Sequence, residues 1–242
     1  MDGTAVTAIE SLARSAHQKT VEVEGVTYST HQLHHVPRRR EEGVDVIELS
    51  SLQGVVDYLE LQEDGLSTDT HFIHVEGPRA VRVVGPLLGQ GETNQRHVYM
   101  TAKVRSDPFP FGAPQTREDM QILLQTRFIA NEDRARALNI IGNLATEESV
   151  RQEDDGMTQR VTVKDGVARL GEKVVENPFL LAPFRTFPEV QPPESPFVLR
   201  LQKMQHGIHT LLIEADGGAW KIDAVARIAE WLSERTAFSV IS

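Results

Sequence analysis

Apolar residues recur along this chain with two different periods, and each period predicts one kind of secondary structure. Over 4–16 they return every three or four positions, which predicts an amphipathic helix. The helical period recurs over 51–61, where Ser51 starts the run as an N-cap and Gly65 follows it as a stop. Both stretches are expected to form helices with one apolar stripe.

Alternation of apolar and polar residues marks the strands of the N-terminal half. The run over 20–30 alternates on both sides of Gly25, a pattern that predicts a β-hairpin. Over 71–104, three runs rich in β-branched and aromatic residues are separated by glycine, proline or polar loops. These three runs predict an antiparallel meander.

Two consecutive helices are expected over 117–145. Thr116 and Asp119 form a capping-box pattern at the start of the first helix, and Asn131 is the expected N-cap of the second. The stretch over 147–156 follows with five acidic residues, so it is predicted to be a solvated loop between two halves of the chain.

The C-terminal half is rich in strands. Asp165 and Gly166 lie between two alternating runs, which predicts a second hairpin over 158–176. Two further strands are expected over 197–204 and 208–215, where β-branched and apolar residues are again frequent.

A helix over 219–235 and an edge strand over 238–242 are expected to end the chain. The helical period predicts that the helix is buried on one side through four residues: Ile222, Val225, Ala229 and Leu232.

The order of these elements predicts the fold class. Helices and antiparallel strands are mixed without a βαβ rhythm, which indicates an α+β protein with antiparallel sheets and packed helices. We expect an N-terminal α+β region over 1–146 and a strand-rich region over 157–242 that includes the terminal helix. One continuous domain is the alternative.

One segment, 177–200, fits neither a helix nor a central strand. It holds six of the chain's 12 prolines and four of its nine phenylalanines. Because proline fixes φ and has no N–H, these prolines are expected to stay out of a central sheet ladder and to stiffen an extended path. Stiffness lowers the entropy lost on docking, and phenylalanine rings offer large apolar faces. The segment is either an arm that reaches a neighbouring subunit or part of its own core, and its candidate interface residues are Phe179, Phe184, Arg185, Phe187 and Phe197.

Two of these rings are expected to differ in role. Phe184 and Phe187 lie three positions apart, so in an extended chain their side chains point to opposite faces. One ring can then anchor in its own domain while the other contacts a neighbour.

Composition and charge narrow the classes of partner. The 242 residues carry a formal net charge of −10, so bulk nucleic acid is not an expected partner without a local basic patch. The chain has no cysteine, which excludes disulfides, thiolate metal sites and a cysteine nucleophile. It shows neither a signal-peptide pattern nor an apolar run of about 20 residues, so we expect a cytoplasmic protein without a membrane span.

The strongest candidate for a metal-binding or phosphate-binding stretch combines histidines and arginines. His31, His34 and His35 have spacings that a metal site could use in a helix, but they follow an expected strand and precede a proline. Arg38–Arg40 could bind phosphate, but two glutamates follow at once. Surface or subunit-contact residues are the favoured interpretation. We therefore assign no catalytic residue, no cofactor and no metal.

Four phrases of the C-terminal half resemble the YfdQ-like proteins of tailed phages and prophages, a family that carries a domain of unknown function. The phrases are DDGMTQRVTVKDG (154–166), NPFLLAPFRTFPEV (177–190), QPPESPFVLRL (191–201) and EADGGAWKIDA (214–224). Their order and spacing match that family, and the stretch over 51–61 is also similar. The resemblance implies a phage-derived protein that acts in the bacterial cytoplasm. It transfers no site residue, because the family has no assigned catalytic residues.

Together these observations favour a non-enzymatic phage accessory protein that forms a homo-oligomer. Two alternatives stay open from the sequence. One is a hydrolase or nuclease-like enzyme whose carboxylates and histidines meet only in the fold. The other is an acidic inhibitor that binds a host protein.

Overall fold

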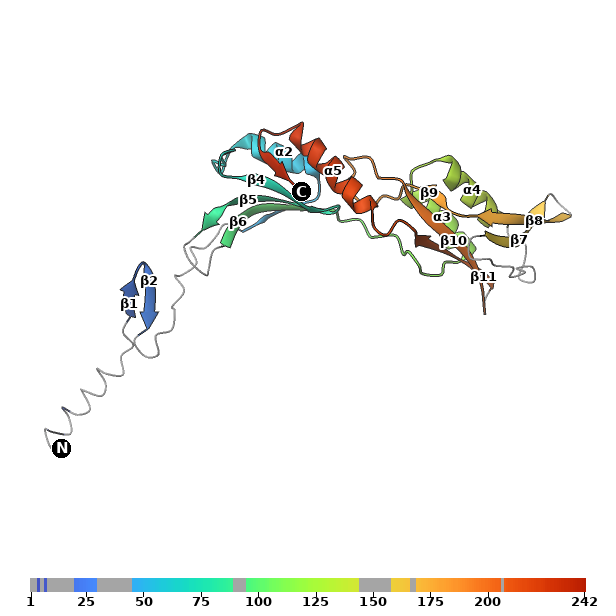
Figure 1. Cartoon of the computed structure of the whole chain (residues 1–242), viewed down its shortest axis with the longest axis horizontal. Helices are drawn as coiled ribbons and strands as arrows, with labels where there is room; N and C mark the ends of the chain where they lie inside the picture. Colours follow the sequence, from blue (N-terminus) through green and yellow to red (C-terminus); the bar gives the residue numbers. More distant parts are fainter. Residues whose placement is uncertain are drawn as a thin grey trace. The chain divides into compact units, whose positions relative to one another are not determined.

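The computed structural model describes most of the chain, and Figure 1 draws it. The described residues are Thr4, Thr7, 20–29, 45–88, 95–143, 158–165, 169–205 and 207–242. Thr4 and Thr7 are helical, while the rest of the helix expected over 4–16 lies outside these residues, as does the loop expected over 147–156. The chain separates into two compact units, Met1–Asp45 and Val46–Ser242.

The first unit contains the β-hairpin expected over 20–30. Strands β1 (Thr20–Val23) and β2 (Val26–Ser29) pair antiparallel, with Thr20 opposite Ser29. Glu24 and Gly25 form the turn with φ values of 51° and 77°. Positive φ at both central residues matches the twist of a two-residue hairpin, so the turn prediction is confirmed.

A five-stranded sheet forms one part of the second unit. It contains the meander expected over 71–104, and its two edge strands pair parallel with their neighbours. In sequence order the strands are β3 (Ile47–Leu49), β4 (Phe72–Gly77), β5 (Ala80–Leu88), β6 (Gln95–Lys103) and β12 (Ser239–Ile241). The spatial order is β12-β4-β5-β6-β3, so β12 is the edge strand that the sequence predicted.

Helix α2 (Leu52–Leu61) packs on this sheet (Figure 1). Ser51 caps the helix as expected, because its Oγ accepts a hydrogen bond from the Gly54 N–H at 3.1 Å. The expected stop at Gly65 is wrong by three residues: Gln62 adopts the left-handed conformation, with φ 54°. The Gln62 side chain donates to the Leu59 carbonyl (2.9 Å), which helps to end the helix at that position.

Helix α5 (Trp220–Ser233) covers the same face of the sheet, and its buried face differs from the expected one. The fully or nearly buried residues are Trp220, Ala224, Ile228 and Leu232. Ile222, which was expected inside, is 74% exposed, while Val225 and Ala229 only flank the core. The helix packs on the sheet along a row of residues that are four positions apart. The sequence could not distinguish this row from the neighbouring stripe, because both are apolar enough to be buried.

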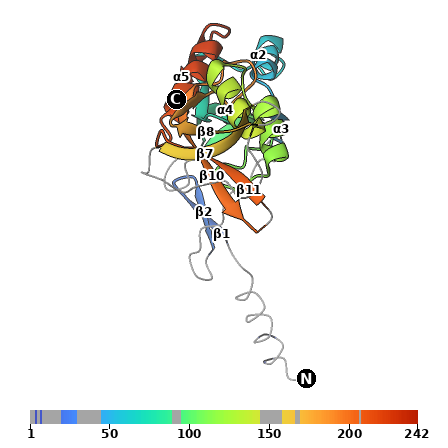
Figure 2. The same ribbon diagram turned by 90° about the vertical axis from the view of Figure 1, so that its right-hand side faces the viewer.

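A three-stranded antiparallel sheet forms the other part of the second unit. Its order is β11-β10-β9, and α3 and α4 lie side by side against it (Figure 2). These elements are α3 (Arg117–Arg127), α4 (Glu132–Gly142), β9 (Phe179–Leu181), β10 (Ser195–Met204) and β11 (Gly207–Glu214). Thr116 and Asn131 cap the two helices through the Asp119 N–H (3.2 Å) and the Arg134 N–H (2.8 Å), as predicted.

The hairpin expected over 158–176 is also present. Strands β7 (Thr158–Asp165) and β8 (Arg169–Glu176) pair antiparallel, while the turn between them lies outside the described residues. The architecture is therefore α+β with packed helices, as the sequence pattern predicted, and its sheets are antiparallel except for the two parallel edge pairs of the five-stranded sheet.

The five-stranded and the three-stranded sheet each have their own hydrophobic core, and both cores use residues from both expected halves of the chain. Phe187, Ile228 and Leu232 from 157–242 pack into the core under α2. Met120 and Leu124 from 1–146 pack against β10 and β11. The chain therefore passes between the cores more than once, and each core depends on segments far apart in sequence.

Candidate interaction site

The first part of the proline-rich segment is hydrogen-bonded to elements around the core of the three-stranded sheet. The Asn177 side chain exchanges two hydrogen bonds with the Leu199 backbone, accepting from its N–H (2.8 Å) and donating to its carbonyl (3.3 Å). Farther along, the Leu180 N–H donates to Asp133 Oδ2 (2.6 Å) and the Phe184 N–H donates to the Arg127 carbonyl (2.9 Å). Helices α3 and α4 thus hold this part of the segment in place.

The next part of the segment is hydrogen-bonded to elements around the core of the five-stranded sheet. Thr186 Oγ1 donates to the Pro78 carbonyl (2.7 Å). Glu189 Oε1 accepts from the Leu52 N–H (2.8 Å) and the Gln53 N–H (3.2 Å), so a distant carboxylate caps the first turn of α2. Residues 177–194 therefore form a brace that is hydrogen-bonded to both cores.

Arg185 is the most enclosed charged residue of the brace, with only 5% of its surface exposed. Its Nη1 forms an ion pair with Glu214, and its Nη2–H donates to Ser195 Oγ (2.6 Å). The guanidinium carbon lies 3.8 Å from the centroid of the Trp220 ring and 5.5 Å from that of Phe197. Arg185 thus joins the brace, the end of β11 and the start of α5.

Electrostatics in this cluster follow from burial and from nearby N–H groups. Burial lowers the pKa of Arg185 to about 10, although the negative charges of Glu214 and Asp216 act to raise it. The guanidinium therefore stays charged at neutral pH. Burial alone would raise the pKa of Asp216. The N–H groups of Gly218 and Trp220, both at 3.0 Å, and the Arg185 charge outweigh it and lower that pKa.

The five candidate interface residues are placed very differently. The rings of Phe179, Phe187 and Phe197 are fully buried in the chain's own cores, and Arg185 is nearly so. Phe184 is 47% exposed. The alternation expected for the pair is thus present, with Phe187 inside and Phe184 outside. Of the five candidates, Phe184 alone therefore has a side chain that is exposed in the single chain, and the other three rings and Arg185 are enclosed by it.

One proline also departs from the expectation. Pro196 is the second residue of β10, the central strand of its sheet, where it lies opposite Leu180. Its carbonyl accepts from the Ala215 N–H (3.0 Å), just beyond the end of β11. In an antiparallel strand the N–H and C=O of one residue point to the same side, so the N–H that proline lacks would point toward β11. The ladder between β10 and β11 ends at this residue, and a proline is therefore tolerated in the central strand.

The outward side of the three-stranded sheet is a second apolar surface. Phe197, Leu199 and Leu201 alternate inward on β10 and are buried. The residues between them point outward together with their direct partners on β9 and β11. We define the outward face by Leu180, Pro196, Val198, Arg200, Leu211 and Ile213, of which Leu180 and Ile213 are 49% and 40% exposed. This surface could not be located from sequence without the pairing register.

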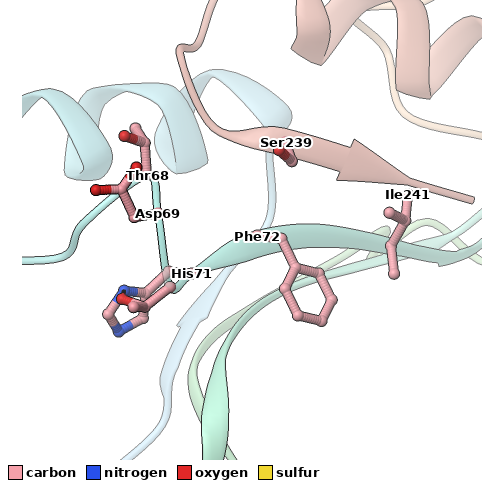
Figure 3. Close-up of a pocket in the computed structure, with 7 residues that line it drawn as sticks. Thr68, Asp69, His71, Phe72, Ser239 and Ile241 are labelled. Carbon is pink, nitrogen blue, oxygen red and sulfur yellow. Dashed lines mark hydrogen bonds between the residues drawn. The ribbon is translucent and has the colours of Figure 1, made fainter.

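A shallow pocket of about 250 Å³ lies where β12 meets the start of β4. Its lining residues are Thr68, Asp69, Thr70, His71, Phe72, Ser239 and Ile241, and Phe72 and Ile241 extend from neighbouring strands (Figure 3). His71 Nδ1 is engaged by the Ser67 N–H (3.1 Å) and by Thr70 Oγ1 (3.0 Å), contacts that fix the turn before β4. These contacts indicate a structural role for the imidazole.

The other sequence candidates are the histidines and arginines of 31–40, whose placement the structure does not describe. His31, His34, His35 and Arg38–Arg40 lie outside the described residues. Within the part of the chain that the structure describes, no three His, Asp or Glu side chains gather as metal ligands do. None of the helices in that part has the length and apolar character of a membrane span.

Comparison with known proteins identifies no family for this chain, so its class is described by the fold. No family model matches the chain, and neither the curated proteins nor the solved structures give a significant match. The molecule is an α+β protein whose two cores are joined by a hydrogen-bonded, proline-rich brace.

Proposed function

We propose that this chain is a phage-derived, cytoplasmic accessory protein that acts without catalysis by assembling into a homo-oligomer. The observation that carries the proposal is the exposed ring of Phe184 on a brace whose neighbouring backbone is hydrogen-bonded. A rigid aromatic anchor loses little entropy on docking, and aromatic residues are enriched in the centres of protein interfaces.

The resemblance to YfdQ-like phage proteins supports the phage origin in this proposal. Two of the phrases that carry it, 177–190 and 214–224, contribute Arg185, Glu214 and Trp220 to the cluster between the cores. The marker residues of the resemblance thus have a structural use in this chain, which accounts for their spacing without a catalytic role.

Light scattering on single variants tests the proposal. The wild type is expected to have a mass that is a multiple of the 27.0 kDa chain. Phe184→Ala should lower that mass and leave the melting temperature nearly unchanged, because the ring is half exposed in the single chain. Phe187→Ala should destabilise by about 3 to 5 kcal/mol through a buried cavity.

Ile222→Ala is the matched control for Phe184→Ala, since Ile222 is also exposed but lies on α5. It should change neither the mass nor the melting temperature. A wild type that stays at 27.0 kDa over the whole concentration range contradicts the proposal. Full assembly of Phe184→Ala shows instead that the ring is not the anchor.

A further inference from the structure

We propose that the junction between the two cores is a hinge and that the stack of Arg185 on Trp220 is the latch that holds it closed. The inference concerns motion within one chain, so it does not depend on the proposed self-assembly. It starts from the packing: the two hydrophobic cores share no member, and the described helices and strands of one make few direct contacts with those of the other. Where two parts of a chain meet through a small, polar interface, relative motion is the default expectation.

In the described part of the second unit, the backbone crosses the junction three times, and hydrogen bonds locate the point at which each crossing can bend. The crossings are 105–116, 182–194 and 215–219. In the third, the Ala215 N–H donates to the Pro196 carbonyl (3.0 Å), so Ala215 is held by the three-stranded sheet. Asp216, the next residue, caps the start of α5 by accepting from the Trp220 N–H (3.0 Å). The bend therefore falls between Ala215 and Asp216.

The crossing through the brace can bend at a single residue. The Phe184 N–H donates to the carbonyl of Arg127, the last residue of α3, which holds this position to the three-stranded side. Thr186 Oγ1 donates to the Pro78 carbonyl in the turn between β4 and β5, which holds the next position but one to the five-stranded side. Only Arg185 lies between these two attachments.

The remaining crossing has an equally narrow gap between its attachments. Arg79, in the turn between β4 and β5, donates to the Ser106 carbonyl, while Phe109 is already buried in the core of the three-stranded sheet. Residues 107–108 lie between them. The hinge therefore consists of 107–108, Arg185 and 215–216, a few positions at the ends of elements, as hinges in proteins commonly are.

The side chain of Arg185 spans this hinge. On the three-stranded side its guanidinium forms an ion pair with Glu214 and donates to Ser195 Oγ (2.6 Å). On the other side it stacks on Trp220 of α5, with its central carbon 3.8 Å from the ring centroid. Trp220 is buried but is a member of neither hydrophobic core. A bend that moves α5 away from the three-stranded sheet therefore separates the indole from the guanidinium.

The closed latch leaves two buried donors without a partner. Arg185 Nε and Trp220 Nε1 are inaccessible to solvent and have no hydrogen-bond acceptor among the described residues. An unsatisfied buried donor is unfavourable, and the desolvation of a buried ion pair offsets much of its attraction. Because opening returns these groups to water, the open arrangement is accessible while both cores stay folded.

Pulsed electron paramagnetic resonance on spin-labelled protein measures the opening. The chain has no cysteine, so Leu61→Cys on α2 and Ile122→Cys on α3, both at exposed positions, label one core each. Labelled chains mixed with an excess of unlabelled wild type report distances within one chain, whatever its state of assembly. Arg185→Lys keeps the charge but lacks the flat stacking surface, so the distribution of label distances should widen about twofold.

Two further variants accompany this measurement. Glu214→Gln removes the ion pair that orients the guanidinium, so it should widen the distribution in the same direction, and it replaces Arg185→Lys if that variant does not fold. Arg235→Lys is the matched control, because Arg235 stacks on Trp231 at the opposite end of α5. It should keep the width of the wild type.

A second pair of labels separates hinge opening from a general loosening of the fold. Leu61→Cys and Ile241→Cys both lie on elements of the five-stranded sheet and its helices, so their distance distribution should keep its width in every variant. If a folded Arg185→Lys, or Glu214→Gln in its place, keeps the width of Arg235→Lys between the two cores, the inference is overturned. Equal widening of the pair within one core overturns it as well.

Discussion

The guanidinium of Arg185 lies over the ring of Trp220, with its central carbon 3.8 Å from the ring centroid. Arg185 belongs to the part of the brace that follows β9, whereas Trp220 is the first residue of α5. Because α5 packs on the five-stranded sheet and Arg185 also binds Glu214 at the end of β11, this stacked pair connects the two cores. A planar cation thus lies between the two cores, and a lysine at this position would have neither its flat stacking surface nor its two-pronged hydrogen bonding.

Arg185→Lys should lower the free energy of unfolding by about 2 kcal/mol, since a lysine keeps the charge but loses the fork to Glu214 and Ser195 and the stacked plane. Urea unfolding measures the change. Arg235→Lys is the control, because Arg235 stacks on Trp231 at 4.3 Å but its side chain is 41% exposed. That replacement should cost less than about 1 kcal/mol. Equal losses for the two would show that the enclosure of Arg185 has no energetic role.

Glu189→Ala should destabilise the protein by about 1 kcal/mol, because the first turn of α2 loses the carboxylate that accepts from Leu52 and Gln53. Glu194→Ala, in the same segment, removes a carboxylate that accepts a long 3.3 Å bond from the Asn131 side chain and should cost less. Thermal melts of the dilute proteins compare the two. A smaller loss for Glu189→Ala than for Glu194→Ala would contradict the capping role.

Asp216 should make the protein sensitive to acid. Its pKa is lowered in the folded state, so the unfolded chain takes up the proton first as the pH falls. The stability that Asp216 contributes is therefore present above about pH 4 and is lost below it. Urea midpoints at about pH 6 and about pH 3 should differ less for Asp216→Asn than for the wild type.

Asp223→Asn is the control for this measurement, since Asp223 is an exposed residue in the first turn of α5. It should keep the acid sensitivity of the wild type. If Asp216→Asn also keeps it in full, the hydrogen bonds from Gly218 and Trp220 do not hold the carboxylate as described.

The buried face of α5 can be tested with two residues of the same type. Ile228→Ala should cost about 2 to 4 kcal/mol, because Ile228 is fully buried in the core of the five-stranded sheet. Ile222→Ala should change the stability by less than about 0.5 kcal/mol, since that side chain is 74% exposed. A larger loss of stability for Ile222→Ala than for Ile228→Ala would show that the helix buries the face that the sequence pattern favoured.

Local patterns in the sequence were sufficient for most elements of this fold. Ser51, Thr116 and Asn131 cap the expected helices, and Gly25 lies in the expected turn. These features depend on hydrogen bonds and backbone angles within a few residues, which is the range over which a sequence can be interpreted alone. The α+β class followed from the order of the elements for the same reason.

Positions that depend on distant neighbours could not be obtained in this way. Ile222 and Ile228 both fit an apolar stripe, and only the sheet beneath α5 determines which of them is buried. Pro196 lies in a central strand because the ladder on its β11 side ends there, which requires knowledge of the strand partner. Left-handed Gln62 ends α2 before Gly65 does, through a contact that composition does not indicate.

The proline-rich segment shows the same division. By itself the sequence determined that 177–200 is stiff and aromatic and that Phe184 and Phe187 point to opposite sides, because proline geometry and strand alternation are local properties. Only the tertiary structure decided that Phe187 is inside, that Arg185 joins Glu214 to Trp220, and that Glu189 caps a helix 137 residues away in the chain. Burial and long-range hydrogen bonds arise from elements brought together by folding, and the spacing of residues along one segment holds no information about them.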